Sequence, residues 1–236
     1  MDEELVRLLD SYTVPKKAAE LLEEAKVVFL VGVSGAGKNT ILSDLLKTGN
    51  YKLVVSHTTR KPRENRGILE VNGQHYHFIN ENTAKHMLEN SEFIEAKIYS
   101  GNVYGTSLKE VEEAYKEGKI AISDIEVQGV AEYMNVSSSV TPIFILPPDF
   151  ETWQERLRAR YAGGEPDQSD LAKRMETAKK ELNEALSKNY FEFVINDELA
   201  RAVTAVDDIA HGRLSATRNE NARRLAEQLL DKLNQA

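Results

Sequence analysis

The sequence lacks several features that would point to particular protein classes. It contains no cysteine, so disulfide bonds, thiolate metal sites and cysteine nucleophiles are all excluded. No apolar run approaches the length that a membrane-spanning helix needs. The segment Met1–Glu4 is acidic, unlike the start of a secretory signal peptide. We therefore expect a cytoplasmic protein.

The chain also lacks a surplus of positive charge. Lysine and arginine together number 30, against 38 aspartate and glutamate residues, which gives a formal net charge of -8. Such a chain is not expected to bind nucleic acid or an anionic membrane as its main activity. Any anion site must therefore be a local cluster of basic residues. With 236 residues, the chain can form one sizeable α/β domain with a small inserted subdomain.

The most informative stretch is a glycine-rich turn between an expected strand and an expected helix. The apolar run Val27–Val31 leads into the pattern G-x-x-x-x-G-K, which is that of a phosphate-binding loop. Glycines allow a tight turn that directs backbone N–H groups at an anion, and the following helix N-terminus adds positive potential. A chance lysine after such a turn is the weaker alternative, because strand and helix patterns flank the motif. We expect these residues to bind nucleotide phosphates: Gly32, Val33, Ser34, Gly35, Ala36, Gly37, Lys38, Asn39 and Thr40.

One position of this loop departs from the usual pattern. The residue after the lysine is normally serine or threonine, whose hydroxyl binds Mg²⁺, but here it is Asn39, and Thr40 follows it. The phosphate cradle is unaffected because it consists of backbone groups. The magnesium ligand stays open, with Thr40 as the nearest hydroxyl.

A second cluster of anion-binding groups follows the buried strand expected at residues 53–55. Ser56 precedes two arginines, Arg60 and Arg63, that lie three positions apart. Arginine side chains match phosphate oxygens with two parallel hydrogen bonds. A solvated basic loop is the alternative, but the position directly after a strand of a phosphate-loop protein favours a second anion site.

Residues 56–106 are rich in expected strands and turns, as in an inserted substrate-binding subdomain. We expect a polar loop at residues 64–72, a strand at Gln74–Phe78 and another at Phe93–Tyr99. The two histidines on one face of the first of these strands have no evident third ligand, so no metal site is expected there.

Carboxylates follow the next expected strand, Ile120–Ile122. Asp124 and Glu126 would lie at the carboxyl end of a parallel strand, where ligands of open α/β sheets bind. An acidic helix start is the alternative for Glu126. For Asp124 we favour a role in ligand binding.

A basic lid is expected over residues 156–180. A helix at 150–161 carries Arg156 and Arg160, and a long charged helix at 169–188 carries Arg174. The glycine-rich segment Gly163–Pro166 lies between them, and arginines on both sides of such a hinge suit a closing lid. Alternating charge on a solvated helix is the alternative for much of the second helix.

The two ends of the chain carry no chemical signature. Residues 1–26 are expected to form two helical pieces, and residues 211–236 end in a helix with an apolar leucine stripe. We expect the two extensions to pack on the body of the protein or to mediate oligomerisation, a homodimer among the possibilities.

Several of these motifs occur in the order found in guanylate kinases. The resemblance covers about residues 27–210 and is carried by these segments: Gly32–Thr40, Ser56–Arg63, Gly73–Phe78, Phe93–Glu95, Gly101–Ser107, Asp124–Gly129 and Asn196–Leu199. An ordered series of motifs is far more specific than any one of them. The resemblance implies a phosphate-loop-type parallel sheet flanked by helices, with a GMP-binding insert and a helical lid. It also implies a transfer from ATP to GMP that gives ADP and GDP, with Mg²⁺.

The resemblance further implies a role for each matching residue. The GMP phosphate would be held by Ser56, Arg60, Arg63, Tyr76 and Tyr104. Guanine would be read by Glu95, Thr106 and Asp124. Lys38, Arg60 and the lid residues Arg156, Arg160 and Arg174 would be catalytic, Asn196 would lie near the ATP base, and Thr40 and Glu126 are the candidate magnesium ligands.

The choice of guanine makes chemical sense at Glu95. A carboxylate accepts hydrogen bonds from N1–H and the 2-amino group of guanine, and adenine offers neither. A site built for such bonds rejects the wrong base by ~10⁴ or more. The chain departs from the family pattern at Asn39, at Ala96, at Glu126 and in extra residues within 64–72. Two alternatives therefore stay open: a catalytically silent module that binds a phosphorylated peptide, and a kinase for another nucleoside monophosphate.

Overall fold

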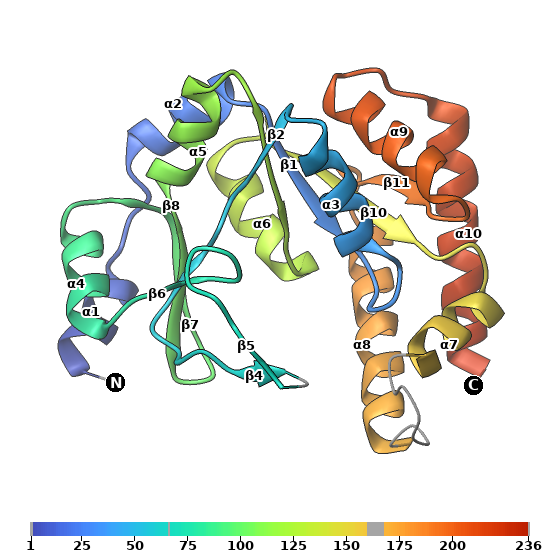
Figure 1. Ribbon diagram of the computed structural model, residues 1–236, viewed down its shortest axis with the longest axis horizontal. Coiled ribbons are helices and arrows are strands. Elements are labelled where there is room, and N and C mark those ends of the chain that lie inside the picture. The colour runs from blue at the N-terminus through green and yellow to red at the C-terminus, as the bar shows by residue number, and fades with distance from the viewer. Residues whose placement is uncertain (1, 66, 160–167, 236) are drawn as a thin grey trace. The chain divides into compact units, whose positions relative to one another are not determined.

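The computed structural model describes residues 2–65, 67–159 and 168–235. The chain divides into two compact units. The first unit holds residues 1–27, 51–123 and 132–140, and the second holds residues 28–50, 124–131 and 141–236. The ribbon in Figure 1 labels the helices and strands of both units.

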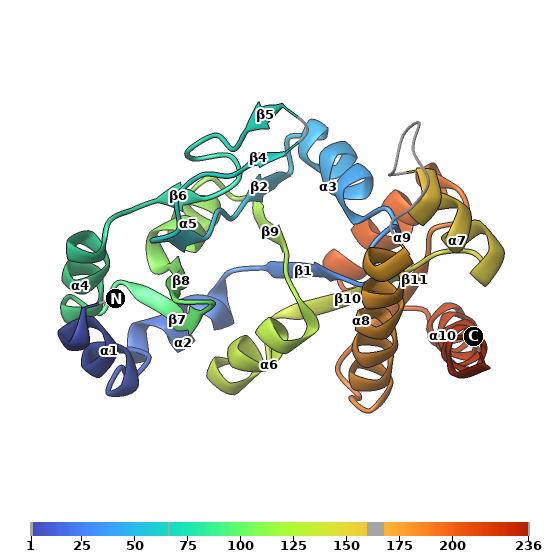
Figure 2. The same cartoon turned by 90° about the horizontal axis from the view of Figure 1, so that it is seen from below.

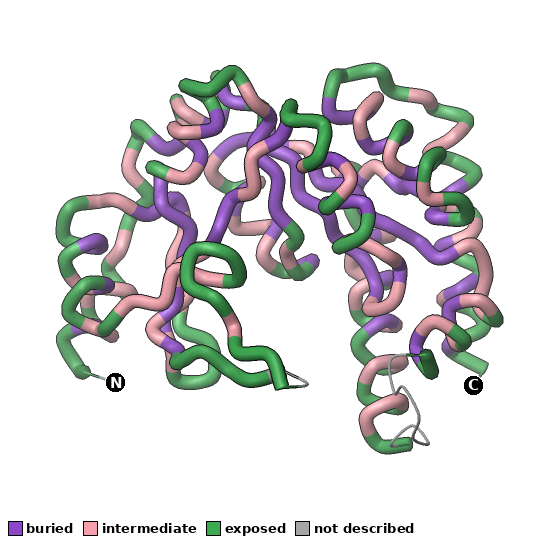
Figure 3. Tube along the Cα trace, in the orientation of Figure 1, coloured by how far each residue is buried: buried purple, intermediate pink, exposed green. Residues whose placement is uncertain are grey.

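The second unit is built on a parallel sheet. Strand β1 (Val27–Val31) pairs with β10 (Thr141–Leu146), and β10 pairs with β11 (Glu192–Ile195), both in parallel. Every residue of β1 is buried, which explains its continuous apolar sequence, since a parallel strand is covered on both faces. Figure 3 shows this burial along the chain. The predicted parallel sheet flanked by helices is confirmed.

Helices cover this sheet. In chain order they are α3 (Lys38–Lys47), α7 (Phe150–Ala159), α8 (Gln168–Leu186), α9 (Leu199–Ala210) and α10 (Ala216–Gln235). Helices α9 and α10 contact β11, and α10 also packs against α8, as both ribbon views show (Figures 1 and 2). Helix α10 buries Ala222, Ala226, Leu229 and Leu233. The C-terminal extension therefore packs on its own unit.

The first unit contains a four-stranded sheet with the order β6-β3-β8-β7. The strands are β3 (His57–Thr58), β6 (His77–Phe78), β7 (Phe93–Tyr99) and β8 (Asn102–Ser107). This unit also holds the parallel pair β2 (Tyr51–Leu53) and β9 (Ile120–Asp124). Its helices are α1 (Glu3–Asp10), α2 (Lys16–Glu24), α4 (Glu81–Glu89) and α5 (Leu108–Lys116), and α6 (Val127–Val136) begins in the second unit and ends in this one.

The strand predicted at residues 53–55 lies two residues earlier than expected. Val54 and Val55 are buried, as their apolar character suggested. The strand ends at Leu53, although the Val54 N–H still donates to the Ile122 carbonyl oxygen of β9 at 2.9 Å. The backbone N–H of Val55 then donates to the Glu110 carboxylate at 3.0 Å, so a side chain replaces the neighbouring strand as its partner.

The loop predicted at residues 64–72 is wrong in part. Strands β4 (Glu64–Asn65) and β5 (Ile68–Leu69) pair in an antiparallel hairpin. Gly67 lies in the turn with φ of +78°, a conformation that glycine adopts at no steric cost. The strand predicted at Gln74–Phe78 is shorter than expected, since only His77 and Phe78 form β6.

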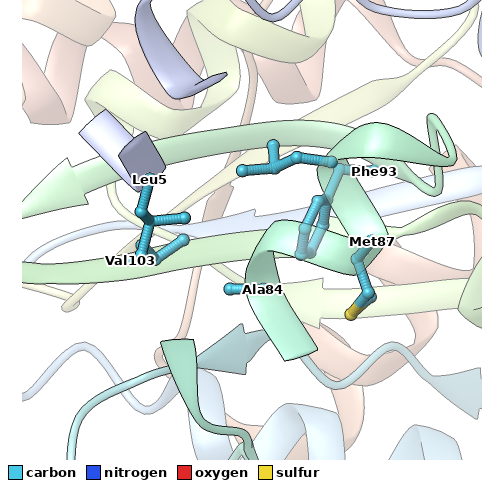
Figure 4. Close-up of a cluster of buried hydrophobic side chains, with 6 residues drawn as sticks. Leu5, Ala84, Met87, Phe93 and Val103 are labelled. Carbon is cyan, nitrogen blue, oxygen red and sulfur yellow. The ribbon is translucent and has the colours of Figure 1, made fainter. Parts of the chain in front are cut away.

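The N-terminal extension contributes to the core of the first unit. Leu5 of α1 is fully buried in a cluster with Ala84, Met87, Phe93 and Val103, and Figure 4 shows these side chains. They come from α1, α4, β7 and β8. Helix α1 is thus packed against the insert rather than extended from it.

None of the helices in the described part of the chain combines the length and the apolar character that crossing a lipid bilayer requires.

We expect Leu5→Ala to lower the free energy of unfolding by about 2–5 kcal/mol, the usual cost of truncating a buried leucine. Leu5 has no exposed surface, so the truncation leaves a cavity between α1 and the insert. Urea unfolding followed by circular dichroism measures the change. Leu69→Ala is the matched control, because Leu69 is 58% exposed and its truncation opens no cavity. Equal stability of the Leu5 variant and the wild type would contradict the packing role of α1.

Candidate functional site

The phosphate loop has the backbone conformation that its glycines suggested. Gly32, Gly35 and Gly37 have φ values of +134°, +90° and +97°, which residues with side chains rarely adopt. The loop joins β1 to α3, whose first helical residue is Lys38. The open N-terminus of α3 and the turn before it are together suited to bind an anion.

A buried asparagine braces this loop from the neighbouring strand end. Asn196 directly follows β11 and is 7% exposed, and its side-chain Nδ2 donates to the carbonyl oxygen of Ala36 at 2.8 Å. A Cβ atom on Gly37 would lie 2.2 Å from that nitrogen. Arg156 Nη2 in turn donates to the Asn196 backbone carbonyl at 3.1 Å. The structure thus places Asn196 and Arg156 against the loop, a contact that the sequence patterns did not suggest.

Ser34 is contacted by two further helices. Trp153 of α7 donates its indole N–H to the Ser34 carbonyl at 2.8 Å. Arg174 of α8 donates from Nη1 to the Ser34 hydroxyl at 3.1 Å, and its Nε donates to Asp170 at 2.8 Å. Both expected lid helices therefore supply groups to the loop. Of the other residues expected in the lid, Arg160 and the hinge at 163–166 lie outside the described residues. Trp153 was missed, although it is the only tryptophan of the chain.

The lysine of the motif folds back onto the start of the loop. Lys38 Nζ donates to the carbonyl oxygen of Gly32. The charge of Lys38 also acts on Glu181 of α8. Burial raises the pKa of the Glu181 carboxyl to about 7, and the positive charge of Lys38 opposes that rise. Val33 and Ala36 are buried, whereas Asn39 and Thr40 are exposed.

The candidate magnesium ligands are accessible oxygen donors. Thr40 in the first turn of α3 and Glu126 just before α6 are both exposed. Hydroxyl and carboxylate oxygens are of the type that Mg²⁺ prefers, usually in combination with substrate phosphates. Within residues 2–65, 67–159 and 168–235, no group of three or more histidine, aspartate or glutamate side chains could hold a metal by itself.

The first unit gathers the expected phosphate-binding residues around Arg60. Its Nε donates to the Tyr104 hydroxyl at 3.2 Å, and its guanidinium lies 5.3 Å from the centre of the Tyr76 ring. Arg60 is 8% exposed. A nearly buried guanidinium is a costly group, so it requires a partner of opposite charge.

That partner is Glu70, which sequence reasoning placed in a polar loop and did not single out. Its two carboxylate oxygens accept from Arg60 Nη1 and Nη2 at 2.7 and 2.9 Å, and one of them accepts from the Arg63 backbone N–H at 2.7 Å. Hydrogen bonds from Arg60 lower the pKa of Glu70 to about 2. The Arg63 side chain is exposed. Glu70 therefore orients Arg60 and ties the Arg63 segment to the β4–β5 hairpin.

The expected base-reading residues form a chain of hydrogen bonds. Ser56 and Thr106 hydroxyls lie 3.2 Å apart, and Thr106 Oγ1 donates to Glu95 Oε1 at 3.0 Å. Burial, followed by the charge of Glu132, raises the pKa of Glu95 to about 7. Tyr133 of α6 is 3% exposed, and its hydroxyl interacts with Glu95 and Thr106. Ser56, expected at the GMP phosphate, is thus joined through Thr106 to Glu95, and Tyr133 was missed by sequence reasoning.

Two other sequence expectations concern Asp124 and the histidines of the 74–78 segment. Asp124 is the last residue of β9 and is exposed, so its carboxylate is accessible to a ligand. The histidines of the 74–78 segment have protein partners: His75 Nδ1 accepts from the Val71 N–H at 3.0 Å, and His77 Nε2 lies 2.8 Å from Glu110 Oε1. Both imidazoles therefore have hydrogen-bonding partners within the protein.

Comparison with known proteins gives a consistent result. The family model described as guanylate kinase matches residues 24–212. The chain is 38% identical over 180 residues to "Guanylate kinase 1" of Oryza sativa subsp. japonica. The aligned region covers 75% of this chain and 45% of that protein. It is 34% identical over 202 residues to guanylate kinase of Schizosaccharomyces pombe, covering 84% of this chain and 96% of that protein. The chain thus spans about half the length of the two plant relatives that it matches but nearly all of the yeast one.

A solved structure supports the fold. The crystal structure of guanylate kinase from Anaplasma phagocytophilum aligns with a TM-score of 0.56 at 24% identity, over 88% of this chain and 97% of that chain. This likeness agrees with the predicted α/β architecture, a parallel sheet flanked by helices.

We expect Gly37→Ala to disturb the phosphate loop more than the same change elsewhere. The positive φ alone costs about 1–2 kcal/mol for a residue with a Cβ atom, and the new methyl group would also displace the Asn196 amide. Urea unfolding and titration with ATP measure the two effects. Gly49→Ala is the matched control, because Gly49 has φ of +78° but no atom within 4 Å of the added Cβ. Equal losses in both variants would contradict the bracing role of Asn196.

We expect Glu95→Gln to stabilise the protein at alkaline pH. The pKa of Glu95 is raised to about 7 from 4.5, so ionisation favours the unfolded chain as pH rises between these values. The native protein therefore loses stability over this window, and the glutamine variant does not. Urea unfolding at about pH 5 and about pH 8 tests this linkage. Glu89→Gln, at an exposed glutamate of the same unit, controls for loss of one charge. If the difference in unfolding free energy between Glu95→Gln and the wild type did not grow with pH, the raised pKa of Glu95 would be refuted.

Proposed function

The chain belongs to the guanylate kinase family, and on this premise we propose that it transfers the γ-phosphoryl group of ATP to GMP, giving ADP and GDP. The observation that carries the proposal is the combination of two features in one chain. One is the braced phosphate loop with Lys38. The other is the pair of hydrogen-bond networks in the first unit, one around Arg60 and one around Glu95.

The second unit supplies the groups for the donor nucleotide. The backbone N–H groups of the phosphate loop and the N-terminus of α3 would bind the ATP phosphates. Lys38 would move from the Gly32 carbonyl to the β- and γ-phosphates. Arg174, which reaches Ser34 from α8, together with Arg156 and Arg160, would neutralise charge on the transferring group. Asn196 is proposed to hold the loop and to lie near the base.

Magnesium would be bound together with ATP. When present, it supplies positive charge that neutralises the phosphate oxygens and orients them. Thr40 and Glu126 are the side chains we propose to bind it, directly or through water, since both are accessible oxygen donors. Asn39 cannot supply the hydroxyl that the motif usually places after the lysine.

The first unit supplies the groups for the acceptor. Arg60, Arg63, Tyr76 and Tyr104 would hold the GMP phosphate, and Glu70 keeps the Arg60 guanidinium in one orientation. Ser56 and Thr106 would assist Glu95 in reading guanine. Asp124, which belongs to the second unit, is also proposed to take part in reading the base. Because protonation of Glu95 removes an acceptor for the guanine N–H groups, its pKa of about 7 implies stronger GMP binding above neutral pH than below it.

The proposed reaction needs no strong general base, because a phosphate acceptor is already ionised at neutral pH. Catalysis then consists of alignment and charge neutralisation. An arginine that stabilises the transferring phosphoryl group is worth ~10³–10⁵ in rate. The lid arginines and Lys38 would supply this stabilisation, and Arg60 would align the acceptor.

A panel of nucleoside monophosphates tests activity and base choice together. With Mg·ATP and an assay coupled to ADP formation, we expect turnover with GMP and little with AMP, UMP or CMP. A preference for another monophosphate would overturn the role of Glu95. Absence of turnover together with absence of ATP binding in calorimetry would instead favour a silent module that binds a phosphorylated peptide.

We expect Lys38→Ala and Arg60→Ala each to reduce turnover by about 10² or more while the protein stays folded. Lys47→Ala is the control, because Lys47 is an exposed lysine at the other end of the same helix. Its described ion pair is with Asp44, one turn away. Arg60→Lys keeps the charge but loses the planar fork, so it should stay impaired. Steady-state kinetics and thermal unfolding measure both properties. Wild-type turnover in either alanine variant would refute the role of that residue.

A further inference from the structure

A tyrosine of the N-terminal extension reaches the strand that carries Glu95. Tyr12 follows α1, and its hydroxyl donates to the Phe93 carbonyl oxygen at 2.7 Å and accepts from the Phe93 N–H at 3.1 Å. One side chain thus satisfies both backbone groups of a single strand residue. Residues 1–23 lie outside the segment that the family model matches, so this contact is an addition of this chain to the matched domain.

The contact falls on a weak point of the sheet. Strand β7 is the last strand in the order β6-β3-β8-β7, so one of its edges has no neighbouring strand. Its pairing with β8 shifts register between Phe93 and Glu95, and such a bulge bends a strand and re-aims the side chains that follow. Beyond the bulge, Glu95 lies opposite Thr106. The orientation of the Glu95 carboxylate therefore depends on how the edge is held at Phe93.

The extension is itself firmly placed against this unit. Leu5 is fully buried, and Leu8, Leu9 and Tyr12 pack against the same apolar cluster, part of which Figure 4 shows. Helix α1 contacts both α4 and β7. At its N-terminus, Lys85 of α4 donates to Glu4 at 2.7 Å. The Tyr12 hydroxyl is thus presented to Phe93 by a docked helix rather than by a free chain end.

Tyr12 and Glu95 also share a cavity. A space of about 470 Å³ is lined by both residues and by Lys97 and Glu132, among others. Lys97 Nζ donates to Glu132 Oε1 at 2.9 Å across it. The extension therefore forms one wall of the space beside the base-reading carboxylate.

We infer that Tyr12 is a positioning residue for Glu95, through which the N-terminal extension sets the selectivity for the guanine base. This inference rests on the proposed function. The phenol ring packs in the cluster, whereas the hydroxyl holds the edge of β7, so removal of the oxygen alone separates the two contributions. Without the hydroxyl, the backbone N–H and C=O of Phe93 lose their hydrogen bonds to Tyr12. The bulge between Phe93 and Glu95, which orients the Glu95 side chain, can then shift.

The test is Tyr12→Phe, compared with the wild type in its affinity for GMP and IMP. IMP has the same phosphate and N1–H as GMP but lacks the 2-amino group, so it reports on the second hydrogen bond to Glu95. We expect the KM and Kd for GMP to rise about tenfold, the effect of one hydrogen bond. The preference for GMP over IMP should narrow, and the KM for ATP should stay unchanged.

Tyr115→Phe is the matched control. Tyr115 is 46% exposed in the same unit, and its hydroxyl bonds to Glu24, so its loss should leave the GMP-to-IMP ratio as in the wild type. Wild-type affinities in the Tyr12→Phe protein would overturn the inference. So would equal losses of activity toward GMP and ATP that match a loss of folded protein. Calorimetric titration with GMP and IMP gives the same ratio without turnover. A wild type that binds GMP but does not phosphorylate it would therefore refute the proposed activity and leave the role of Tyr12 measurable, and a wild type that binds no GMP would refute both.

Discussion

The contact between the Asn196 amide and the Ala36 carbonyl is the constraint on which the nucleotide-binding side of this protein depends. It joins the loop after β1 to the residue after β11, two points far apart in sequence. It is possible only because Gly37 has no Cβ atom, which would lie 2.2 Å from the asparagine nitrogen. Trp153 and Arg174 then reach Ser34 in the same loop from α7 and α8. The phosphate loop is therefore held at both its backbone and its side chains before any ligand binds.

Two glutamates in the first unit show how surroundings give one side-chain type opposite properties. Glu70 accepts from the Arg60 fork and from a backbone N–H, and these hydrogen bonds lower its pKa to about 2. Glu95 is buried beside Glu132, and the cost of its charge raises its pKa to about 7. The first carboxylate is suited to hold a cation in place at all physiological pH values. The charge of the second is poorly compensated by its protein neighbours, and a raised pKa of this kind is a common feature of functional sites.

The N-terminal extension changes how the insert is built. Strand β7 has a free edge, and free edges are usually protected by a covering element. Here α1 covers that edge and adds Leu5 to the apolar cluster beneath it. The Tyr12 hydroxyl completes the hydrogen bonding of Phe93 at the bulge. The N-terminal segment, which carries no chemical signature in its sequence, therefore supports the strand that carries Glu95.

The sequence by itself determined the phosphate loop and the parallel α/β class, because these depend on local spacing and on residue chemistry. The second anion site at Arg60 and Arg63 was likewise a prediction from residue chemistry, whereas the role of Glu95 was implied by the resemblance to guanylate kinases. The glycines of the loop have positive φ, which glycine adopts at no steric cost, and the strand before them is buried throughout. The tertiary structure alone decided the partners. Glu70 lies in a segment that looks like a polar loop, and Tyr12 lies 81 positions from Phe93. No periodicity records such contacts, since they arise when the folded chain places distant polar groups together in surroundings where each needs a hydrogen-bonding partner.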